Sequence, residues 1–537
     1  MLFTILESIL VAIACCAASV DYVHALQAGR YQLPAYRQWL TRNRDRILKE
    51  NVLWAFAAAA MKAYLPVLMS MFISVEQTRR AIANALVLVL FVALTGWVTW
   101  RDYSRPSKRP FVATKRVRRL LSVLLALCLV LSALFAVMKP TAIPVYFLFA
   151  LMPFMVLLAA AIINPYETRL NASFFKSARR KIRERKDLIT IGVTGSYGKT
   201  NVKFILRDML SAKYNVLATP ASFNTAMGVS RVINDQLKRE HQVFIAEMGA
   251  THVGDIKELV DLVRPKYGIL TSIGPRHMDT FGSMENIAST KFELIQGLPR
   301  EGFAVFGSGD DYIRRLYALC RHDKCRIGLD GDDGAFMRAE GIAFSDKGTT
   351  FNMVCADGES ARCRTRLLGT YNVKNILLAA ALARKLGLSM EEIAAKTKEL
   401  TPIEHRLQLT SGEFTMIDDT LNEDADSAFE AMRVIAQMPG RRIVVTPGLG
   451  EQGGKEADVN YALGTVMADS ADAVILVGRR AFTRSIIRGM MQSGFSRSNL
   501  HTADDMDDAS EILSEVADAG DTVLFESRIP DYEEYNA

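Results

Sequence analysis

Residues 188–200 read Leu188-Ile-Thr-Ile-Gly-Val-Thr-Gly-Ser-Tyr-Gly-Lys-Thr200, and this stretch decides the fold of the larger part of the chain. An apolar strand, predicted over Leu188–Val193, runs directly into a glycine-rich loop. A helix is expected next, because apolar residues recur at helical spacing at Val202, Ile205, Leu206 and Met209. A strand, a glycine-rich loop and a helix in this order are the context that a phosphate-binding P-loop requires.

The residue types in the loop fit phosphate binding. Two glycines let backbone N–H groups approach phosphate oxygens, and the helix N-terminus adds its dipole. Lys199 would reach the β- and γ-phosphates, and the Thr200 hydroxyl would ligate Mg²⁺. The strict P-loop motif has a glycine at the position of Val193, so a glycine turn that occurs by chance is the alternative. The ending Gly-Lys-Thr favours nucleotide binding. The predicted ATP-binding loop comprises Thr194, Gly195, Ser196, Tyr197, Gly198, Lys199 and Thr200.

Outward from this loop, short apolar strands alternate with amphipathic helices from Asp187 onward, which indicates α/β domains with mainly parallel sheets. We predict a central P-loop domain with a parallel sheet over 187–402 and a Rossmann-like C-terminal domain over 403–537. Short alternating strands predict a β-rich excursion of the central domain at Asp330–Arg364. A membrane α-helical domain, 1–164, and a basic juxtamembrane linker, 165–186, precede them.

The membrane domain follows from composition. The chain has 537 residues, of which 50% are apolar, and the apolar excess lies almost entirely before residue 165. Five apolar stretches are each close to the ~20 residues that a helix needs to cross a bilayer. The second of them carries Lys62, which must face the bundle or a polar cavity. The stretches are Leu2–Val20, Val52–Ile73, Ala81–Trp100, Leu120–Met138 and Ala142–Ile163.

Basic residues predict the orientation of these helices. They crowd the first and third connections, whereas the second and fourth are short and carry few, so the first and third are cytoplasmic by the positive-inside rule. The N-terminus is then outside, and everything after residue 164 is inside: a multi-pass protein of the cell membrane with cytoplasmic catalytic domains. A cleaved signal peptide is disfavoured because the first stretch has no basic n-region. The formal charge of +7 comes mainly from these basic connections. We expect the basic juxtamembrane residues to contact anionic lipid and not nucleic acid.

Further motifs follow the loop along the chain. They are Ser222-Phe-Asn-Thr-Ala-Met-Gly228, Ala246-Glu-Met-Gly-Ala250, Gly254-Asp-Ile256, Thr271-Ser-Ile-Gly-Pro-Arg-His-Met-Asp279, Ser289-Thr-Lys-Phe-Glu293, Gly369-Thr-Tyr-Asn-Val-Lys-Asn375, His405-Arg-Leu407 and Asp418-Asp-Thr-Leu-Asn422. In this order, and over roughly residues 187–530, the chain resembles the Mur ligase family, the ATP-dependent amide-forming enzymes of peptidoglycan precursor synthesis. The stretch Asp418–Ser427 is similar to the Asp-Ser-Tyr-Asn-Ala-Asn-Pro-Asp-Ser of the branch that adds D-alanyl-D-alanine to the UDP-N-acetylmuramoyl-tripeptide.

The resemblance implies ATP and Mg²⁺ as cofactors and assigns roles to matching residues. Glu247 ends a predicted strand, Val243–Ala246, at the sheet edge where α/β folds bind ligands, and would hold Mg²⁺ with Thr200. The catalytic residues would be Lys199, His277 at a second Mg²⁺, and Lys291, which would support the metal site once carbamylated. Asn375 would contact the adenine, and Arg406 the phosphates, supported by Asp419. The substrate contacts would be Asn224, Thr225, Asn422, Glu451 and Lys455.

The implied reaction activates a carboxylate with ATP to an acyl phosphate, which an amine attacks to give an amide, ADP and phosphate. Three departures from the family pattern bear on the substrates. Helices replace the N-terminal domain that holds the UDP-sugar, so the peptidoglycan-precursor acceptor is either lipid-linked or presented by a partner. Tyr371 stands where the family has His. The ending Leu524–Asp531 lacks the family's Lys-Gly-Ser, which leaves the amine, an amino acid or a dipeptide, open.

Two other functions are compatible with parts of the sequence. Gly448-Leu-Gly-Glu-Gln-Gly453 follows a predicted strand, Arg442–Thr446, and with Arg479 and Arg480 would suit an NADP-binding oxidoreductase, although a lone fingerprint is weak. A membrane-anchored, non-catalytic scaffold of the same fold is the second alternative. Four cysteines of the central domain, at 320, 325, 355 and 363, have no tight Cys-x-x-Cys pair and do not favour a zinc site.

Overall fold

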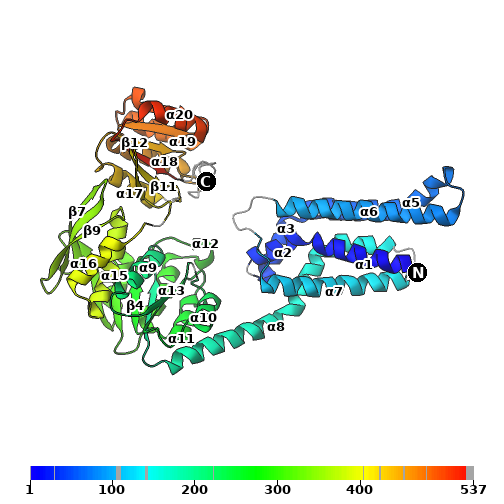
Figure 1. Cartoon of the computed structure of the whole chain (residues 1–537), viewed down its shortest axis with the longest axis horizontal. Coiled ribbons are helices and arrows are strands. Elements are labelled where there is room, and N and C mark those ends of the chain that lie inside the picture. The colour runs from blue at the N-terminus through cyan, green and yellow to red at the C-terminus, as the bar shows by residue number, and fades with distance from the viewer. Residues whose placement is uncertain are drawn as a thin grey trace. The chain divides into compact units, whose positions relative to one another are not determined.

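Figure 1 shows the computed structural model of the chain. It describes residues 2–29, 31–104, 111–138, 143–221, 223–402, 404–421, 425–450, 454–478 and 481–527. Contacts divide the chain into two compact units, Met1–Ser173 and Phe174–Ala537.

The N-terminal unit is helical throughout its described parts. Its long helices pack around buried apolar side chains that include Val11, Leu124, Tyr146 and Met152. The helices are α1 (Leu2–Ala17), α2 (Val20–Ala28), α3 (Leu33–Arg42), α4 (Arg44–Ile47), α5 (Leu53–Leu68), α6 (Glu76–Tyr103), α7 (Lys115–Met138) and α8 (Leu148–Glu184), with short π or 3₁₀ segments at Leu48–Val52, Met69–Met71 and Ile143–Phe147.

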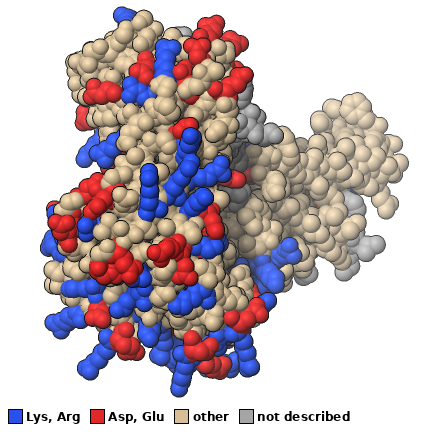
Figure 2. Space-filling view, turned by 60° about the vertical axis from the view of Figure 1, so that its left-hand side comes forward, with Lys and Arg blue, Asp and Glu red and all other residues tan. Residues whose placement is uncertain are grey.

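Five helical stretches in this unit are long and apolar enough to cross a membrane, as the sequence predicts. They are Thr4–Ala28, Arg44–Met71, Glu76–Tyr103, Lys115–Phe135 and Ile143–Glu184. The two units also differ on the surface. In Figure 2, Lys, Arg, Asp and Glu side chains cover the C-terminal unit densely, while the N-terminal unit is almost free of them on the visible face. Each stretch overlaps one of the predicted spans.

Lys62 of α5 faces the interior of the bundle, as expected for a charge in an apolar helix. It forms an ion pair with Glu7 of α1, and both side chains are buried, with 5% and 1% exposed. The Tyr146 hydroxyl donates a 2.7 Å hydrogen bond to the same Glu7 oxygen. Pairing compensates a charge that would otherwise be costly in an apolar environment.

The segment 165–186, predicted as a linker, is mostly helical, because α8 continues without a break from Leu148 to Glu184. Pro153 and Pro165 both lie within it. In its last turns Ala178 and Ile182 are buried in a core of the C-terminal unit, and the Lys181 amine donates to the backbone oxygen of Ile233 at 2.9 Å. Apolar positions at i and i+4 explain why this basic stretch packs instead of forming a solvated tether.

The first half of the C-terminal unit is built on a nine-stranded sheet of order β2-β3-β1-β4-β5-β6-β7-β8-β9. The first seven in this order pair in parallel, and β8 is antiparallel to both β7 and β9. The predicted β-rich excursion is therefore confirmed as β7–β9. The strands are β1 (Ile189–Thr194), β2 (Val216–Ala218), β3 (Val243–Glu247), β4 (Tyr267–Leu270), β5 (Phe303–Phe306), β6 (Asp323–Leu329), β7 (Met337–Ser345), β8 (Gly348–Cys355) and β9 (Ser360–Thr365).

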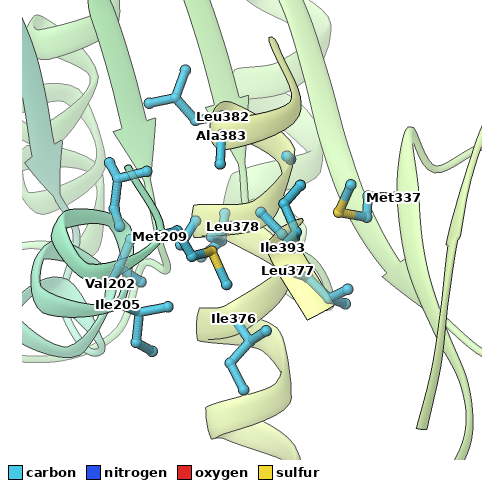
Figure 3. Close-up of a cluster of buried hydrophobic side chains, with 14 of the residues drawn as sticks. Val202, Ile205, Met209, Met337, Ile376, Leu377, Leu378, Leu382, Ala383 and Ile393 are labelled. Carbon is cyan, nitrogen blue, oxygen red and sulfur yellow. The ribbon is translucent and has the colours of Figure 1, made fainter. Parts of the chain in front are cut away.

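Helices cover both faces of this sheet. On one face α9 and α15 pack against the strands, and Figure 3 shows Val202 and Ile205 from α9 beside Ile376 from α15 in that core. The opposite core contains side chains from α10, α11, α13 and α14. The helices are α9 (Lys199–Leu210), α10 (Ala226–Asp235), α11 (Asp255–Val263), α12 (Met278–Phe281), α13 (Met284–Gln296), α14 (Asp311–Leu319), α15 (Thr370–Lys385) and α16 (Met390–Glu399).

The second half has a six-stranded sheet of order β10-β11-β15-β12-β13-β14. All neighbours pair in parallel except the edge strand β10, which is antiparallel to β11. The α/β class with mainly parallel sheets, predicted from the alternating pattern, is confirmed, and each sheet also contains antiparallel pairing. The elements are β10 (Gln408–Ser411), β11 (Thr415–Asp419), α17 (Ala425–Ile435), β12 (Arg442–Thr446), α18 (Glu456–Ser470), β13 (Ala473–Val477), α19 (Ala481–Gln492), a 3₁₀ turn (Arg497–Asn499), β14 (Leu500–Ala503), α20 (Met506–Val516) and β15 (Thr522–Glu526).

Candidate active site

The glycine-rich loop joins β1 to the N-terminus of α9, at the carboxyl edge of the central sheet. β1 lies between β3 and β4, so the loops that follow these strands converge on it. Gly198 has φ of 78°, and a Cβ built there would lie 2.5 Å from Oδ1 of Asn375. Only glycine fits this position, because a side chain would be strained and would collide.

Hydrogen bonds hold the loop against the segment that follows β4. The Ser196 hydroxyl donates to the backbone oxygen of Gly274 at 3.0 Å and accepts from its N–H at 2.8 Å. The Tyr197 N–H donates to Oγ of Ser272 at 3.1 Å, and the Thr194 hydroxyl to the backbone oxygen of Met248 at 2.8 Å. The loop is therefore fixed by side chains and is preorganised for an oxyanion.

Lys199 folds back over the loop. Its amine donates to the backbone oxygens of Gly195 and Ser196 at 2.8 and 3.1 Å. Burial lowers the pKa of this ammonium from 10.5 to about 8, nearby Glu247 opposes the shift, and Arg276 adds to it. A cation held on carbonyl oxygens above a glycine loop can exchange those contacts for phosphate oxygens.

Glu247 ends β3 beside the loop and is 1% exposed. Its Oε2 accepts from the Thr200 hydroxyl at 3.0 Å, and its Oε1 accepts from the Asn224 amide at 2.9 Å. The pair of Thr200 and Glu247, predicted from strand ends, thus comes together. Asn224, predicted as a substrate contact, lies against this carboxylate.

A further residue at this carboxylate was missed by the sequence analysis. Lys203 is fully buried, and its amine lies 3.0 Å from Oε2 of Glu247. A signal existed: Lys203 is three residues after Thr200 and four after Lys199, so the three share one helix face. The signal is weak, because a lysine between apolar helix positions is usually a solvated charge.

Lys291, on α13, is 3% exposed. Burial, together with the charges of Lys199 and Arg276, lowers the pKa of its ammonium from 10.5 to about 7. The Arg276 guanidinium lies over the Tyr197 ring at 5.6 Å. Three cationic side chains therefore gather around the loop, an arrangement that suits a polyanionic ligand.

His277 lies in the same segment as Arg276 and is exposed. Its backbone adopts φ of 62° and ψ of 34°, left-handed values that are uncommon for a side-chain-bearing residue. Its backbone oxygen accepts from the N–H groups of Thr280 and Phe281 at 3.1 Å. Strain of this kind is often retained at functional sites.

Asn375 lies on α15 and contacts the loop through Oδ1, as described for Gly198. The side chain is buried, and its Nδ2 has no hydrogen-bond partner. A buried amide without a partner costs free energy, so its retention points to a ligand acceptor that is absent here. Tyr371 precedes it by one helical turn, on the same face of α15.

A second cluster surrounds Arg406, which is exposed. Its neighbours His405 and Leu407 have φ of 60° and 43°, both in the left-handed region. Asp419 accepts from the Leu407 N–H at 3.1 Å, and Asp418 contacts Nδ1 of His405 at 2.8 Å. The two carboxylates hold a strained turn that presents the arginine.

Helix α15 carries residues near both the glycine loop and the Arg406 cluster. Burial raises the pKa of the Tyr371 hydroxyl, the charge of Asp419 raises it further, and the charge of Arg406 opposes the shift. The Thr370 N–H, at the helix start, donates to Glu430 of α17 at 2.5 Å. The helix that carries Asn375 to the loop thus begins beside the Arg406 cluster.

Of the remaining predicted residues, two are described by the structure and the others lie outside the described residues. Thr225 caps α10, because its hydroxyl accepts from the Gly228 N–H at 3.3 Å. Lys455 is an exposed residue at the start of α18. Asn422, Glu451, Arg479 and Arg480 lie outside the residues that the structure describes.

Known proteins share this arrangement of domains. Residues 193–383 match the Mur ligase middle domain, and residues 405–528 match the Mur ligase, glutamate ligase domain. The chain belongs to the Mur ligase family. Its members are ATP-dependent ligases that form amide bonds.

Among curated Mur ligases, the UDP-N-acetylmuramoyl-tripeptide–D-alanyl-D-alanine ligase of Escherichia coli is 29% identical over 314 residues, which cover 58% of this chain and 69% of that protein. The enzyme of the same name from Mycobacterium tuberculosis is 32% identical over 258 residues, 47% of this chain and 50% of that protein. The chain thus spans between half and about seven-tenths of the length of these relatives. Both matched family domains lie in the C-terminal unit.

Solved Mur ligases have the same fold as the C-terminal unit. A crystal structure of MurF from Acinetobacter baumannii superposes with a TM-score of 0.57 at 25% identity, covering 67% of this chain and 78% of that one. MurF from Thermotoga maritima, solved in complex with ADP, superposes with a TM-score of 0.56 at 22% identity and covers 67% and 80%.

The residues of this Mur ligase fit both expected cofactors. For ATP, the unpartnered Asn375 amide, the glycine loop and three cationic side chains provide donors for a base and for phosphates. For Mg²⁺, Thr200 and Glu247 offer hard oxygen ligands. Among the described residues, no group of three or more His, Cys, Asp or Glu could hold a metal.

Proposed function

We propose that this protein is an ATP-dependent ligase that forms an amide bond on a cell-wall peptide precursor at the cytoplasmic face of the membrane. One observation carries the proposal: Lys199, Lys291 and the Thr200–Glu247 pair lie around one preorganised glycine loop. A scaffold that had lost catalysis would have no physical need to keep buried lysines beside that loop.

The chemistry has two steps. A carboxylate oxygen of the precursor forms a bond to the γ-phosphorus of ATP as the bond to the β–γ bridging oxygen breaks, giving an acyl phosphate and ADP. The nitrogen of an amine then attacks the acyl carbon, phosphate leaves with the electron pair of the C–O bond, and the amine loses a proton. Lys199 stabilises charge on the transferring group, and the fixed loop orients it.

The remaining predicted residues have supporting tasks. Asn375 would donate its free amide to the adenine, and Arg406 would contact the phosphates from the second cluster. Mg²⁺, held by Thr200 and Glu247, with His277 and a carbamylated Lys291 at a second ion, would supply electrostatic stabilisation of the phosphates. The low pKa of Lys291 supports carbamylation, since only the neutral amine reacts with carbon dioxide.

The N-terminal unit suggests the acceptor. Its five apolar stretches occupy the place of a soluble domain that would hold a UDP-sugar, and basic residues flank their predicted cytoplasmic ends. We therefore favour a lipid-linked precursor over a soluble nucleotide-sugar. D-alanyl-D-alanine is the preferred amine, because the named relatives add it and Asp418–Ser427 is similar to their motif.

Phosphate release tests this function. The full chain in detergent is supplied with ATP and Mg²⁺, and single amino acids and D-alanyl-D-alanine are each combined with UDP-linked and lipid-linked precursors. Release that requires both an amine and a precursor supports the ligase. No amine-dependent release in any combination would favour the scaffold, and tight NADPH binding would favour the oxidoreductase.

A further inference from the structure

Lys203 is a buried cation placed directly on the candidate metal ligand. Its side chain is fully buried, and the amine donates to Oε2 of Glu247 at 3.0 Å and to the backbone oxygen of Ala221 at 2.6 Å. It also lies 4.2 Å from the centre of the Phe204 ring. A lysine ammonium in such a site needs a compensating charge, and Glu247 supplies it.

The contacts of Lys203 join three segments. Lys203 comes from α9, Glu247 from the end of β3, and Ala221 from the connection between β2 and α10. Ala221 has φ of 41°, a left-handed value that an alanine adopts only when its surroundings hold it there. Asn224 in the same connection donates to the other oxygen of Glu247, so both oxygens of the carboxylate are already engaged.

This arrangement affects metal binding through charge. Oε2 of Glu247 accepts from both Lys203 and Thr200 at 3.0 Å, so an ion bound by Glu247 and Thr200 would have the ammonium as a close neighbour. Like charges a few ångströms apart repel strongly where water is excluded. Lys199 and Lys291 add positive charge nearby, and nucleotide phosphates would bring the negative charge that offsets all three.

We propose that Lys203 is a positioning residue that acts through Glu247: as its resident counter-cation, it orients the carboxylate and suppresses divalent-metal binding until nucleotide phosphates are present. The inference rests on the proposed function for the identity of the ligands. It explains why a metal site would have a lysine hydrogen-bonded to the buried carboxylate of Glu247, a contact that otherwise opposes metal binding.

Binding of Mn²⁺ to the full chain in detergent tests the inference. Free Mn²⁺ is measured by electron paramagnetic resonance with and without a non-hydrolysable ATP analogue. Without nucleotide we expect Lys203→Met to bind Mn²⁺ at least about tenfold more tightly than the wild type, and Lys203→Arg to behave as the wild type. With the analogue, the difference between Lys203→Met and the wild type should shrink.

Arg207→Met is the matched control, because Arg207 is one turn further along α9 and lies at the surface beside Asp208. It should leave Mn²⁺ binding unchanged in both conditions. Lys203→Met with equal or weaker Mn²⁺ binding than the wild type would overturn the inference and leave a packing role.

The wild type provides a second test that needs no variant to fold. Tight Mn²⁺ binding by the nucleotide-free wild type would also overturn the inference, whereas binding that requires the analogue supports it. These results are independent of amine-dependent phosphate release, so failure of the proposed function is distinguishable from failure of this inference.

Discussion

At the scale of single residues, Lys199 is the side chain on which ATP turnover should depend most. We expect Lys199→Ala to abolish ATP hydrolysis while leaving the protein folded, because the hydrogen bonds that the amine donates go to loop carbonyls. Phosphate release and thermal unfolding measure the two effects. Lys213→Ala, which removes an exposed amine in the turn after α9, is the control, and unchanged turnover in Lys199→Ala would refute the site.

Lys291 should make stability depend on pH. Its pKa is about 7 in the folded protein and 10.5 in the unfolded chain, so between these values the unfolded state binds more protons and stability rises with pH. Lys291→Met lacks this contribution. Its stability advantage over the wild type should be greatest below about pH 7 and should shrink by up to ~1.4 kcal/mol per pH unit toward pH 10. Urea unfolding of both proteins across this range measures it, and a pH-independent difference would contradict the burial of the charge.

Asn375 offers a test of the nucleotide site that is separate from catalysis. Asn375→Leu removes a buried donor without a partner, so thermal stability should not fall. Nucleotide affinity should weaken by about 1–3 kcal/mol, the cost of a lost hydrogen bond in a buried site. Titration with a fluorescent ATP analogue measures this, and unchanged affinity would place the adenine elsewhere.

Much of this site was predictable at the residue scale, for a simple reason. The carboxyl ends of neighbouring parallel strands meet at one edge, so a loop after one strand and Glu247 at the end of another had to lie close. For Lys203 the helical spacing indicates only that it shares a face with Lys199 and Thr200; that its amine is buried on Glu247 depends on packing that the sequence pattern does not show.

At the scale of elements, the turn at 405–407 shows how two carboxylates can hold a strained backbone. Asp419→Ala removes the acceptor of the Leu407 N–H and should lower the free energy of unfolding by about 1–3 kcal/mol. If this turn positions Arg406, Asp419→Ala should also weaken nucleotide binding, and adding Arg406→Ala should cause little further loss. Additive losses in the double variant would show that the two residues act separately.

Element boundaries followed the sequence closely where the pattern was strong. The strand predicted at Arg442–Thr446 is β12, and the one predicted at Val243–Ala246 is β3 with one added residue. The continuity of α8 through 165–184 was missed, because this segment is mostly basic and polar. Its helical pattern consists of a few apolar positions, among them Ala178 and Ile182. The antiparallel edge strand β10 was also missed, since its four residues carry too short a pattern.

At the scale of the whole molecule, the predicted orientation can be tested with cysteine labelling. Ser74, between α5 and α6, is predicted outside, and Ser104, at the end of α6, inside. In intact cells a membrane-impermeant maleimide should label Ser74→Cys, and it should label Ser104→Cys only after lysis. The native cysteines of the described chain are buried or half-buried, which keeps the background low. Labelling of Ser104→Cys in intact cells would reverse the orientation.

The division of the chain into an apolar unit and an α/β unit could be read from composition alone, because hydrophobic content changes abruptly near residue 165. The partners inside the apolar unit could not. The sequence shows that Lys62 needs a polar neighbour, but Glu7 is 55 residues away, and neither periodicity nor spacing connects them.

This buried ion pair has a consequence for how the protein is made. An isolated Glu or Lys at the centre of a bilayer costs about 2.5–3.5 kcal/mol on insertion scales. In the predicted membrane topology, α1 carries Glu7 and emerges from the ribosome before α5, so its release into lipid as a single helix is penalised until α5 delivers Lys62. We therefore expect α1 to wait at the insertion machinery for α5, so that the order of synthesis becomes part of how the bundle assembles.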